Sequence, residues 1–129
     1  MSRALLWQML IVGLGGFFGT VGRFLVSGLV HRFLPPTFPY GTLTVNVLGC
    51  LAIGYLGGLV QARSLLDPSQ RLFILIGVLG GFTTFSTFAY ETMTLTQSSE
   101  LLKGAVNVVS HVGLGLAAAW LGFLTAQNM

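Results

Sequence analysis

The sequence predicts an all-α, polytopic membrane protein with four transmembrane helices, the third of which is broken in mid-membrane. The composition is the first observation behind this prediction, because 53% of the 129 residues are hydrophobic and only 7% are charged, with a mean hydropathy of +0.85. Soluble domains carry about 25% charged residues. The second observation is a succession of four apolar segments, each long enough to cross about 30 Å of hydrocarbon. The third is a run of hydroxyl residues inside the third segment.

The four spans follow one another with short polar connections. The first is predicted at residues 5–30; its start resembles a signal peptide, but Gly-rich apolar sequence continues where a cleavage pattern would stand. Three prolines within residues 34–39 exclude a helix there, and the second span follows at 40–60. In the polar segment 61–71, Asp67-Pro68-Ser69 is typical of a helix start. The third and fourth spans are predicted at 72–96 and 101–124, within a single domain of 129 residues.

Glycines recur every four residues within three of the spans, and this spacing indicates close helix packing. Small residues at such spacing let helix backbones approach each other in lipid, where the hydrophobic effect no longer drives association. The pairs are Gly15 and Gly19, Gly54 and Gly58, and Gly77 and Gly81.

The basic residues are scattered, and they specify neither a nucleic-acid surface nor an orientation in the membrane. The net charge is +3, but no cluster of Lys and Arg could follow a phosphate backbone. Lys and Arg normally gather in cytoplasmic loops; here three fall on each side of a four-span bundle. Either the chain inserts in both orientations, in which case it could assemble as an antiparallel homodimer, or something outside this sequence sets its orientation. The two sets are Arg3, Arg63 and Arg71 against Arg23, Arg32 and Lys103.

The polar residues within the spans do not predict an enzyme. No His, Cys, Asp and Glu cluster has the spacing of a metal site, and His31 and His111 lie on distant helices without a convincing catalytic partner. The single cysteine, Cys50, is expected to be a small apolar side chain within a helix.

The hydroxyl-rich run at residues 80–88 predicts the break in the third span. Two glycines and four Ser or Thr residues weaken a helix at that point, and a broken helix is tolerated within a membrane only where its freed backbone groups are buried or line a cavity. Such breaks expose carbonyls that bind cations and amide groups that favour anions. The alternative is that the hydroxyls only bond back to their own helix.

Two phenylalanines in this run favour an anion. An aromatic ring has a positive edge, so Phe85 and Phe88, three residues apart on one helix face, could solvate a small anion edge-on. The hydroxyls of Ser86 and Thr87 and the amide of Asn46 could donate hydrogen bonds to it. The alternative is that both rings pack against lipid or neighbouring helices.

At this point the sequence resembles the Fluc (CrcB) family of fluoride channels. The resemblance covers nearly the whole chain and rests on three blocks in a fixed order. They are Gly15-Gly16-Phe17-Phe18-Gly19 leading to Arg23, Gly41-Thr42-Leu43-Thr44-Val45-Asn46-Val47-Leu48-Gly49, and Gly77-Val78-Leu79-Gly80-Gly81-Phe82-Thr83-Thr84-Phe85-Ser86-Thr87-Phe88 followed by Glu91.

The resemblance implies a fluoride-selective channel that exports fluoride passively from the bacterial cytoplasm across the inner membrane. It implies a dual-topology antiparallel homodimer with two pores, each built from both subunits, and a structural Na⁺ at the dimer centre. The implied pore residues are Asn46, Phe85, Ser86, Thr87 and Phe88; Arg23 and Glu91 would lie in the vestibules; backbone carbonyls of Gly80 and Thr83 would bind the Na⁺. The fourth span fits the family less well: Asn107 and Ser110 could continue a polar track, whereas His111 is a departure from the pattern.

Two other functions compete with the channel. A small proton-coupled multidrug transporter is also a four-span, dual-topology protein, but it needs a carboxylate embedded in the membrane, and Glu91 is predicted beyond the break, towards a helix end. A helper subunit of a larger complex would explain the glycines but not the hydroxyl and Phe run.

Overall fold

The computed structural model describes residues 2–63 and 65–129 and is built entirely of helices in that part of the chain. The elements are α1 (Arg3–Phe33), α2 (Tyr40–Arg63), α3 (Pro68–Arg71), the π-helix η1 (Leu72–Val78), α4 (Leu79–Phe82), α5 (Phe85–Gln97) and α6 (Leu101–Gln127). Of the basic residues counted for orientation, the side chain of Arg63 lies outside the described part of the structure.

Four helical segments are long and apolar enough to cross a membrane in the part of the chain that the structure describes: Arg3–Phe33, Tyr40–Gln61, Pro68–Gln97 and Leu101–Gln127. Each predicted span lies inside one of them. The segments extend a few residues further than the predicted spans because a helix continues into its polar ends, whereas the span counts apolar residues only. The protein is thus a multi-pass membrane protein.

Local chemistry sets the start of the third segment at Pro68, four residues before the predicted span. Asp67 Oδ1 accepts the backbone N–H of Gln70 at 2.9 Å, and the side chain of Gln70 accepts the N–H of Asp67 at 3.0 Å. This reciprocal capping box, with Pro68 in the first helical turn, satisfies amide groups that a helix start leaves unpaired. The Asp67-Pro68-Ser69 start predicted from the sequence is confirmed.

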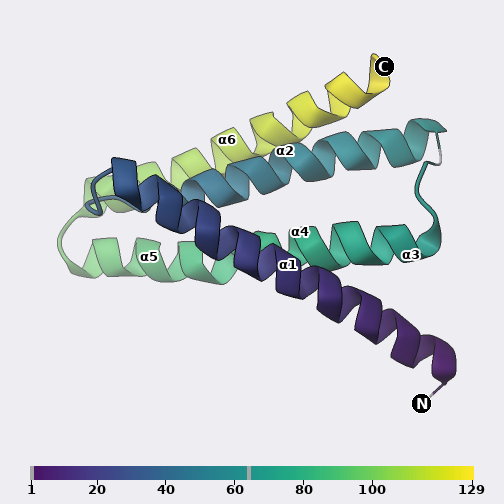
Figure 1. Ribbon diagram of the computed structural model, residues 1–129. Helices are drawn as coiled ribbons and strands as arrows, with labels where there is room; N and C mark the ends of the chain where they lie inside the picture. Colours follow the sequence, from purple (N-terminus) through teal and green to yellow (C-terminus); the bar gives the residue numbers. More distant parts are fainter. Residues whose placement is uncertain (1, 64) are drawn as a thin grey trace.

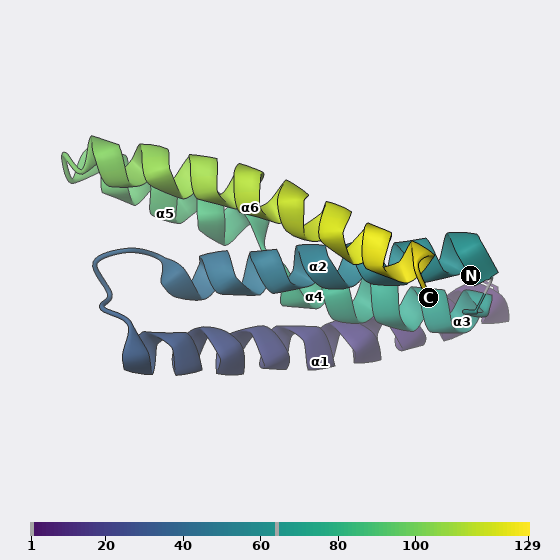
Figure 2. The same cartoon turned by 90° about the horizontal axis from the view of Figure 1, so that it is seen from above.

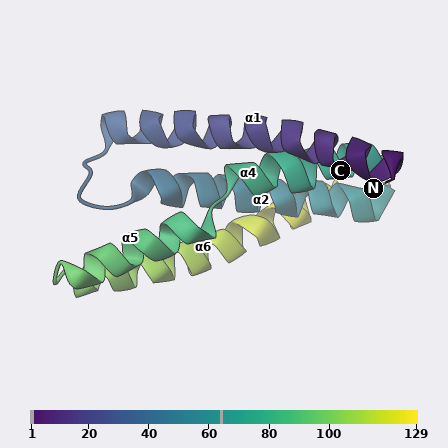
Figure 3. The ribbon, with the colours of Figure 1, turned by 90° about the horizontal axis from the view of Figure 1, so that it is seen from below.

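The third segment is not one continuous α-helix, because its backbone conformation changes along its length. It passes from α3 into the π-helix η1, then into the single turn α4. Helical geometry stops after Phe82, because Thr83 and Thr84 have extended backbones with ψ of 156° and 110°, and α5 begins at Phe85. Figure 1 shows α4 and α5 in one row, and Figure 3 shows the short stretch of extended chain that joins them.

The segments form a bundle in which each of the two halves of the third segment has its own neighbour. α2 packs along α6, α1 packs on η1 and α4, and α5 packs on α6. Figure 1 shows α2 and α6 side by side, with α1 crossing the row of α4 and α5. Figure 2 and Figure 3 agree that both termini lie at the same end, opposite the α1–α2 and α5–α6 connections.

Glycines allow the closest of these approaches. A Cβ at Gly19 would overlap the carbonyl oxygen of Val78 and lie 2.8 Å from the backbone N of Phe82. A Cβ at Gly54 would overlap the carbonyl of Ala119, and one at Gly122 would lie 2.7 Å from the backbone N of Tyr55. The small residues predicted to mediate packing therefore place α1 against the third segment and α2 against α6.

We predict opposite effects of the same substitution at two glycines of α2. Gly54→Ala places a methyl group into the backbone of Ala119 and should lower the free energy of unfolding by about 1–3 kcal/mol. Gly57→Ala meets no atom within 4 Å and should leave stability unchanged or raise it by up to about 1 kcal/mol, since Ala favours helix. Denaturation in detergent micelles, followed by circular dichroism, measures both. Equal losses in the two variants would contradict the close contact.

Candidate functional site

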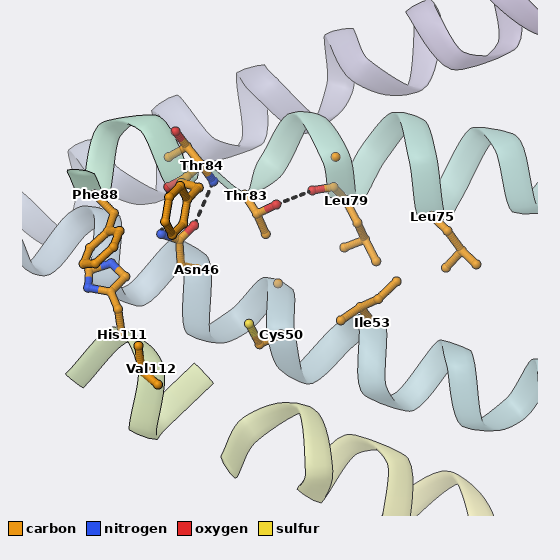
Figure 4. Close-up of a pocket in the computed structure, with 13 residues that line it drawn as sticks. Asn46, Cys50, Ile53, Leu75, Leu79, Thr83, Thr84, Phe88, His111 and Val112 are labelled. Carbon is orange, nitrogen blue, oxygen red and sulfur yellow. Dashed lines mark hydrogen bonds between the residues drawn. The ribbon is translucent and has the colours of Figure 1, made fainter. Parts of the chain in front are cut away.

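The site is organised by the two extended residues between α4 and α5. The backbone N–H of Thr84 donates to Asn46 Oδ1 at 2.8 Å, and its carbonyl accepts a hydrogen bond from Asn46 Nδ2 at 3.0 Å. Figure 4 shows the carboxamide of Asn46, from α2, reaching this residue. In a continuous helix the N–H of Thr84 would bond to the carbonyl of Gly80. One side chain thus replaces the helical partners of both backbone groups of Thr84.

The hydroxyls of the run divide into two roles. Thr83 Oγ1 donates to the carbonyl of Leu79 at 3.0 Å, which is the back-bonding expected of Ser and Thr in helices. Thr84 Oγ1 instead accepts the backbone N–H of Thr87 at 3.2 Å and donates to Thr87 Oγ1 at 2.9 Å. Thr84 is therefore the N-cap of α5, and Ser86 Oγ lies 3.4 Å from its hydroxyl.

The backbone carbonyls of Gly80 and Thr83 are among those that lose their helical donors at this point. The N–H of Thr84, the helical partner of the Gly80 carbonyl, is bonded to Asn46, and the N–H of Thr87, the helical partner of the Thr83 carbonyl, is bonded to Thr84 Oγ1. Gly80 is exposed, and a Cβ there would meet no atom within 4 Å. These are the two carbonyls for which the family resemblance implies a cation; carbonyl oxygens are suitable ligands for hard cations.

Phe85 and Phe88 lie together just beyond the break. Their ring centroids are 5.3 Å apart with an interplanar angle of 56°. Phe88 is buried, with 8% of its surface exposed, whereas Phe85 is 79% exposed on the surface of this chain. Two tilted rings of this kind can turn their positive edges towards a shared space.

A cavity of about 390 Å³ opens beside these rings, and we call it the Phe85 cavity. Figure 4 shows Asn46, Cys50 and Ile53 facing it from α2, Leu75 and Leu79 from the third segment, and Phe88 and His111 stacked at one end. Its polar lining comes mainly from Asn46, Thr83, Thr84 and His111. The predicted pore residues Asn46, Phe85 and Phe88 are therefore brought to one cavity.

Thr84 also borders a second cavity of about 440 Å³ on its α1 side, here called the Arg23 cavity. α1 contributes Thr20, Arg23 and Ser27 to its lining, and Thr87 contributes from α5. Thr87 thus lines the Arg23 cavity and not the Phe85 cavity, and Ser86 is exposed. The guanidinium of Arg23 makes this cavity suitable for attracting an anion.

Glu91 lies in a different place from Arg23. Its Oε1 accepts a hydrogen bond from the Thr42 hydroxyl at 2.7 Å, and its Oε2 is buried without a hydrogen-bond partner in the described structure. It lines a third cavity of about 230 Å³ with residues of the α1–α2 connection, and His31 borders both this and the Arg23 cavity. The two predicted vestibule residues do not share one cavity.

The polar residues of α6 include one that sequence reasoning did not assign. Asn107 is fully buried and its Nδ2 donates to Thr92 Oγ1 at 2.9 Å, while Ser110 is half-buried. From α6 it is His111 and Val112, not Ser110, that line the Phe85 cavity. The signal was available: Asn107 and His111 share a helix face with the buried residues Gly104, Gly115, Ala118 and Gly122.

Metal-ligating side chains do not gather at the site. In the described residues, no three His, Cys, Asp or Glu side chains could hold one metal ion.

Comparison with known proteins gives a consistent result over most of the chain. Residues 10–123 match the family model described as CrcB-like protein, Camphor Resistance (CrcB). A protein of Methylobacillus flagellatus named fluoride-specific ion channel FluC is 43% identical over 119 residues, covering 92% of this chain and 93% of its own length. Proteins of the same name from Campylobacter jejuni subsp. jejuni and Opitutus terrae are 48% and 44% identical, over 90% and 93% of this chain and 94% and 92% of their own lengths.

Removing the carboxamide of Asn46 is expected to destabilise the break. Asn46→Leu keeps the side-chain volume but leaves the N–H and carbonyl of Thr84 without their partner, so the free energy of unfolding should fall by about 2–5 kcal/mol. Denaturation in micelles measures this loss.

Thr83→Val is the matched control for Asn46→Leu. The hydroxyl of Thr83 bonds only to the Leu79 carbonyl, which also accepts the backbone N–H of Thr83 at 3.0 Å. Its loss should therefore cost about 1 kcal/mol or less. If Asn46→Leu were as stable as Thr83→Val, the carboxamide would not be holding the break.

Proposed function

Because this chain belongs to the CrcB-like family, we propose that it is a fluoride-selective ion channel that exports fluoride passively from the cytoplasm and so relieves fluoride toxicity. The relatives named as fluoride-specific ion channels match it over at least nine-tenths of both chains. Their name describes an ion channel and not an enzyme. The geometric observation that carries the proposal is the pair Phe85 and Phe88 beside a helix break held by Asn46.

The proposed path uses neutral donors and ring edges in place of fixed charge. Asn46 donates one amide hydrogen to the carbonyl of Thr84, and its second amide hydrogen can donate to an anion. Thr87 accepts the hydroxyl hydrogen of Thr84, so its own hydroxyl hydrogen remains free to donate. Ser86 is then the donor in its 3.4 Å contact with Thr84 Oγ1 and would have to turn from it to bind an anion. Such donors give a small anion strong hydrogen bonds. A buried cation would instead bind the anion too tightly, whereas conduction requires binding weak enough for release.

The flanking residues extend this path in the proposal. Arg23, in its cavity beside Thr87, would raise the local concentration of anions at one mouth. Glu91 would lie towards an aqueous mouth, as its place beside the α1–α2 connection supports. Asn107 and Ser110 would belong to a polar track along α6. The helix break would lie in mid-membrane, where its hydrogen bonds to Asn46 compensate for the absence of water.

We also propose that the chain acts as an antiparallel, dual-topology homodimer in the bacterial inner membrane. The even division of Lys and Arg between the two sides supports insertion in both orientations. Phe85 is 79% exposed and Gly80 is exposed, so a pore that uses this ring and these carbonyls would be completed by a second copy. Two pores, each built from both subunits, follow from this arrangement.

A structural Na⁺ at the centre of the proposed dimer fits the chemistry of the break. The carbonyls of Gly80 and Thr83 have lost their helical donors, and two copies would supply four such oxygens. A bound Na⁺ would supply positive charge that holds the two breaks together. The residues of this chain would supply the ligand oxygens and hold the extended backbone that presents them.

A proton-coupled transporter remains the alternative function, because Glu91 is a half-buried carboxylate on a membrane helix with one free oxygen. Such a transporter would need a proton gradient for flux, whereas a channel would not. Family membership favours the channel.

Replacing either ring of the Phe pair should abolish conduction. In liposomes loaded with potassium fluoride and followed with a fluoride electrode, the wild-type chain should release fluoride rapidly without a proton gradient. Phe85→Ile and Phe88→Ile keep apolar bulk but remove the ring edge, so fluoride efflux should fall by at least about tenfold, the equivalent of about 1.4 kcal/mol of lost anion stabilisation.

Phe33→Ile is the matched control, because Phe33 is 80% exposed at the end of α1 and is remote from the break. It should conduct as the wild type does. Size-exclusion elution of each variant checks assembly. Unchanged efflux in both Phe85→Ile and Phe88→Ile would refute the proposed lining, and efflux that requires a proton gradient would favour the transporter.

The dimer and its Na⁺ predict two measurable properties. A reporter fused to the C-terminus should be detected on both faces of the membrane in comparable amounts. Purified protein should elute as two copies, and replacing Na⁺ with N-methyl-D-glucamine should lower its melting temperature by several degrees, because a ligand of the folded dimer stabilises it by mass action.

These results separate the two parts of that proposal. A reporter found on one face only would refute dual topology. A dimer whose melting temperature is the same in both cations would refute the Na⁺ site while leaving the dimer intact. Two controls are necessary. The reporter must be labelled without lysis of the cells, and the two buffers must have equal ionic strength.

A further inference from the structure

A short chain of hydrogen bonds joins α5 to α6 beside Phe88. The hydroxyl of Thr92 donates to the backbone carbonyl of Phe88 at 2.8 Å and accepts from Asn107 Nδ2 at 2.9 Å. The backbone carbonyl of Asn107, a fully buried residue, lies 3.0 Å from His111 Nδ1. A carbonyl only accepts hydrogen bonds, so Nδ1 carries the proton and donates it. The chain therefore runs from the backbone of Phe88 to the imidazole of His111.

The imidazole then returns to the side chain of Phe88. The two ring centroids are 4.4 Å apart with an interplanar angle of 39°, and Figure 4 shows the rings against each other. The ring nitrogens are used between helices: Nδ1 bonds to Asn107, while Nε2 is buried and faces the backbone carbonyl of Thr42 on α2. His111 thus meets the Phe pair with its ring and not with a hydrogen-bonding atom.

Thr92, Asn107 and His111 therefore hold Phe88 at two points, and we call them the Phe88 clamp. The hydroxyl of Thr92 holds its carbonyl, and the imidazole of His111 contacts its ring. The helices are close enough for this because a glycine lies one turn before Asn107: a Cβ at Gly104 would lie 3.1 Å from Thr96 Oγ1. A buried, connected polar network of this kind makes one arrangement of its members rigid.

A fixed ring plane matters because the sign of the interaction with an anion depends on it. The face of an aromatic ring is negative and its edge is positive. The terminal torsion of a Phe side chain has broad minima, so the helix backbone alone does not set the direction of that edge. Phe85 lies 5.3 Å from Phe88 but is itself 79% exposed on this chain. The buried neighbour that can fix the plane of Phe88 is His111.

We propose that the Phe88 clamp sets the plane of the Phe88 ring so that its edge points into the anion path. Thr92 and His111 are then positioning residues that govern fluoride conduction through Phe88, and Asn107, assigned above to a polar track, is the link between them. The inference rests on the proposed channel function and deepens it. It also gives His111, the departure from the family pattern, a use that needs no hydrogen bond to the ion.

The same substitution at two threonines of α5 tests the first half of the clamp. Thr92 and Thr96 both donate to the carbonyl four residues earlier, at 2.8 and 2.9 Å, but Thr92 also accepts from Asn107. Thr92→Val should therefore lower fluoride efflux from liposomes by about three- to tenfold, the factor that corresponds to one lost aromatic contact. Thr96→Val should conduct as the wild type does, and Thr92→Ser, which keeps the hydroxyl, should restore conduction.

Two substitutions of His111 separate its ring from its hydrogen bond. His111→Asn keeps an N–H donor at the position of Nδ1 but removes the ring, so efflux should fall by about three- to tenfold. His111→Phe removes the donor but keeps a ring against Phe88, and should retain at least about half of the wild-type rate. If His111 acted through its donor, the order of the two variants would be reversed. That reversed order would overturn the proposal.

The position of the Phe88 ring can be observed directly by NMR in micelles. With ¹³C-labelled Phe, the variant Phe88→Ile identifies the Phe88 signal by its loss. Protons that lie over a neighbouring aromatic ring are shielded, so this signal should be displaced upfield in the wild type. It should move downfield in His111→Asn and Thr92→Val and stay in place in His111→Phe and Thr96→Val.

The two readouts together distinguish a clamp on Phe88 from a mere joint between α5 and α6. A simple joint would lower the melting temperature of Thr92→Val and His111→Asn without moving the Phe88 signal, and that result would overturn the proposal. A displaced signal with unchanged fluoride efflux would overturn it as well. If one of these variants does not elute as assembled protein, the other decides. Absence of efflux from the wild type would instead refute the channel function.

Discussion

The structure depends on one constraint: a backbone group that leaves a helix within a membrane-spanning segment must find other hydrogen-bond partners, because lipid supplies none. Asn46 meets this constraint at Thr84 with one carboxamide, which accepts from the N–H and donates to the carbonyl. Few side chains could do so, since only Asn and Gln offer a donor and an acceptor in this arrangement. The break, the freed carbonyls and the position of the Phe pair all follow from that pairing.

Close helix packing is a precondition for it. Asn46 reaches the break only because α2 approaches the third segment at Gly49, where a Cβ would overlap the methyl group of Thr83. On the other side, α1 approaches the same segment through Gly19 and Gly81, whose Cβ positions would meet the backbone of Val78 and Gly16. The glycines thus bring two helices onto opposite sides of α4, and the hydroxyls and the carboxamide then satisfy the backbone between them.

The sequence was informative where a residue type has one dominant physical use. Prolines, a capping Asp and apolar length placed the helical segments, and the hydroxyl run contained the two extended residues, Thr83 and Thr84. It could not identify the hydrogen-bond partner of Asn46, because an Asn with a free amide and an Asn with a paired carboxamide are the same residue in a sequence. It also could not show that Thr87 lines the Arg23 cavity and not the Phe85 cavity. The cavity that a side chain faces depends on the rotation of its helix about its own axis, which is set by packing against the neighbouring helices.

The two sides of the site differ in hydrogen-bond character. Towards α1 the groups with free donor hydrogens are the hydroxyl of Thr87 and the guanidinium of Arg23, whereas Asn46 faces the Phe85 cavity. Towards α5 and α6 the buried groups without hydrogen-bond partners are acceptors, at Glu91, Asn107 and His111. In the proposed channel an anion would be stabilised on the first side and disfavoured beside the buried acceptors of the second. The helix break therefore lies at the boundary between a side with free hydrogen-bond donors and a side with buried acceptors.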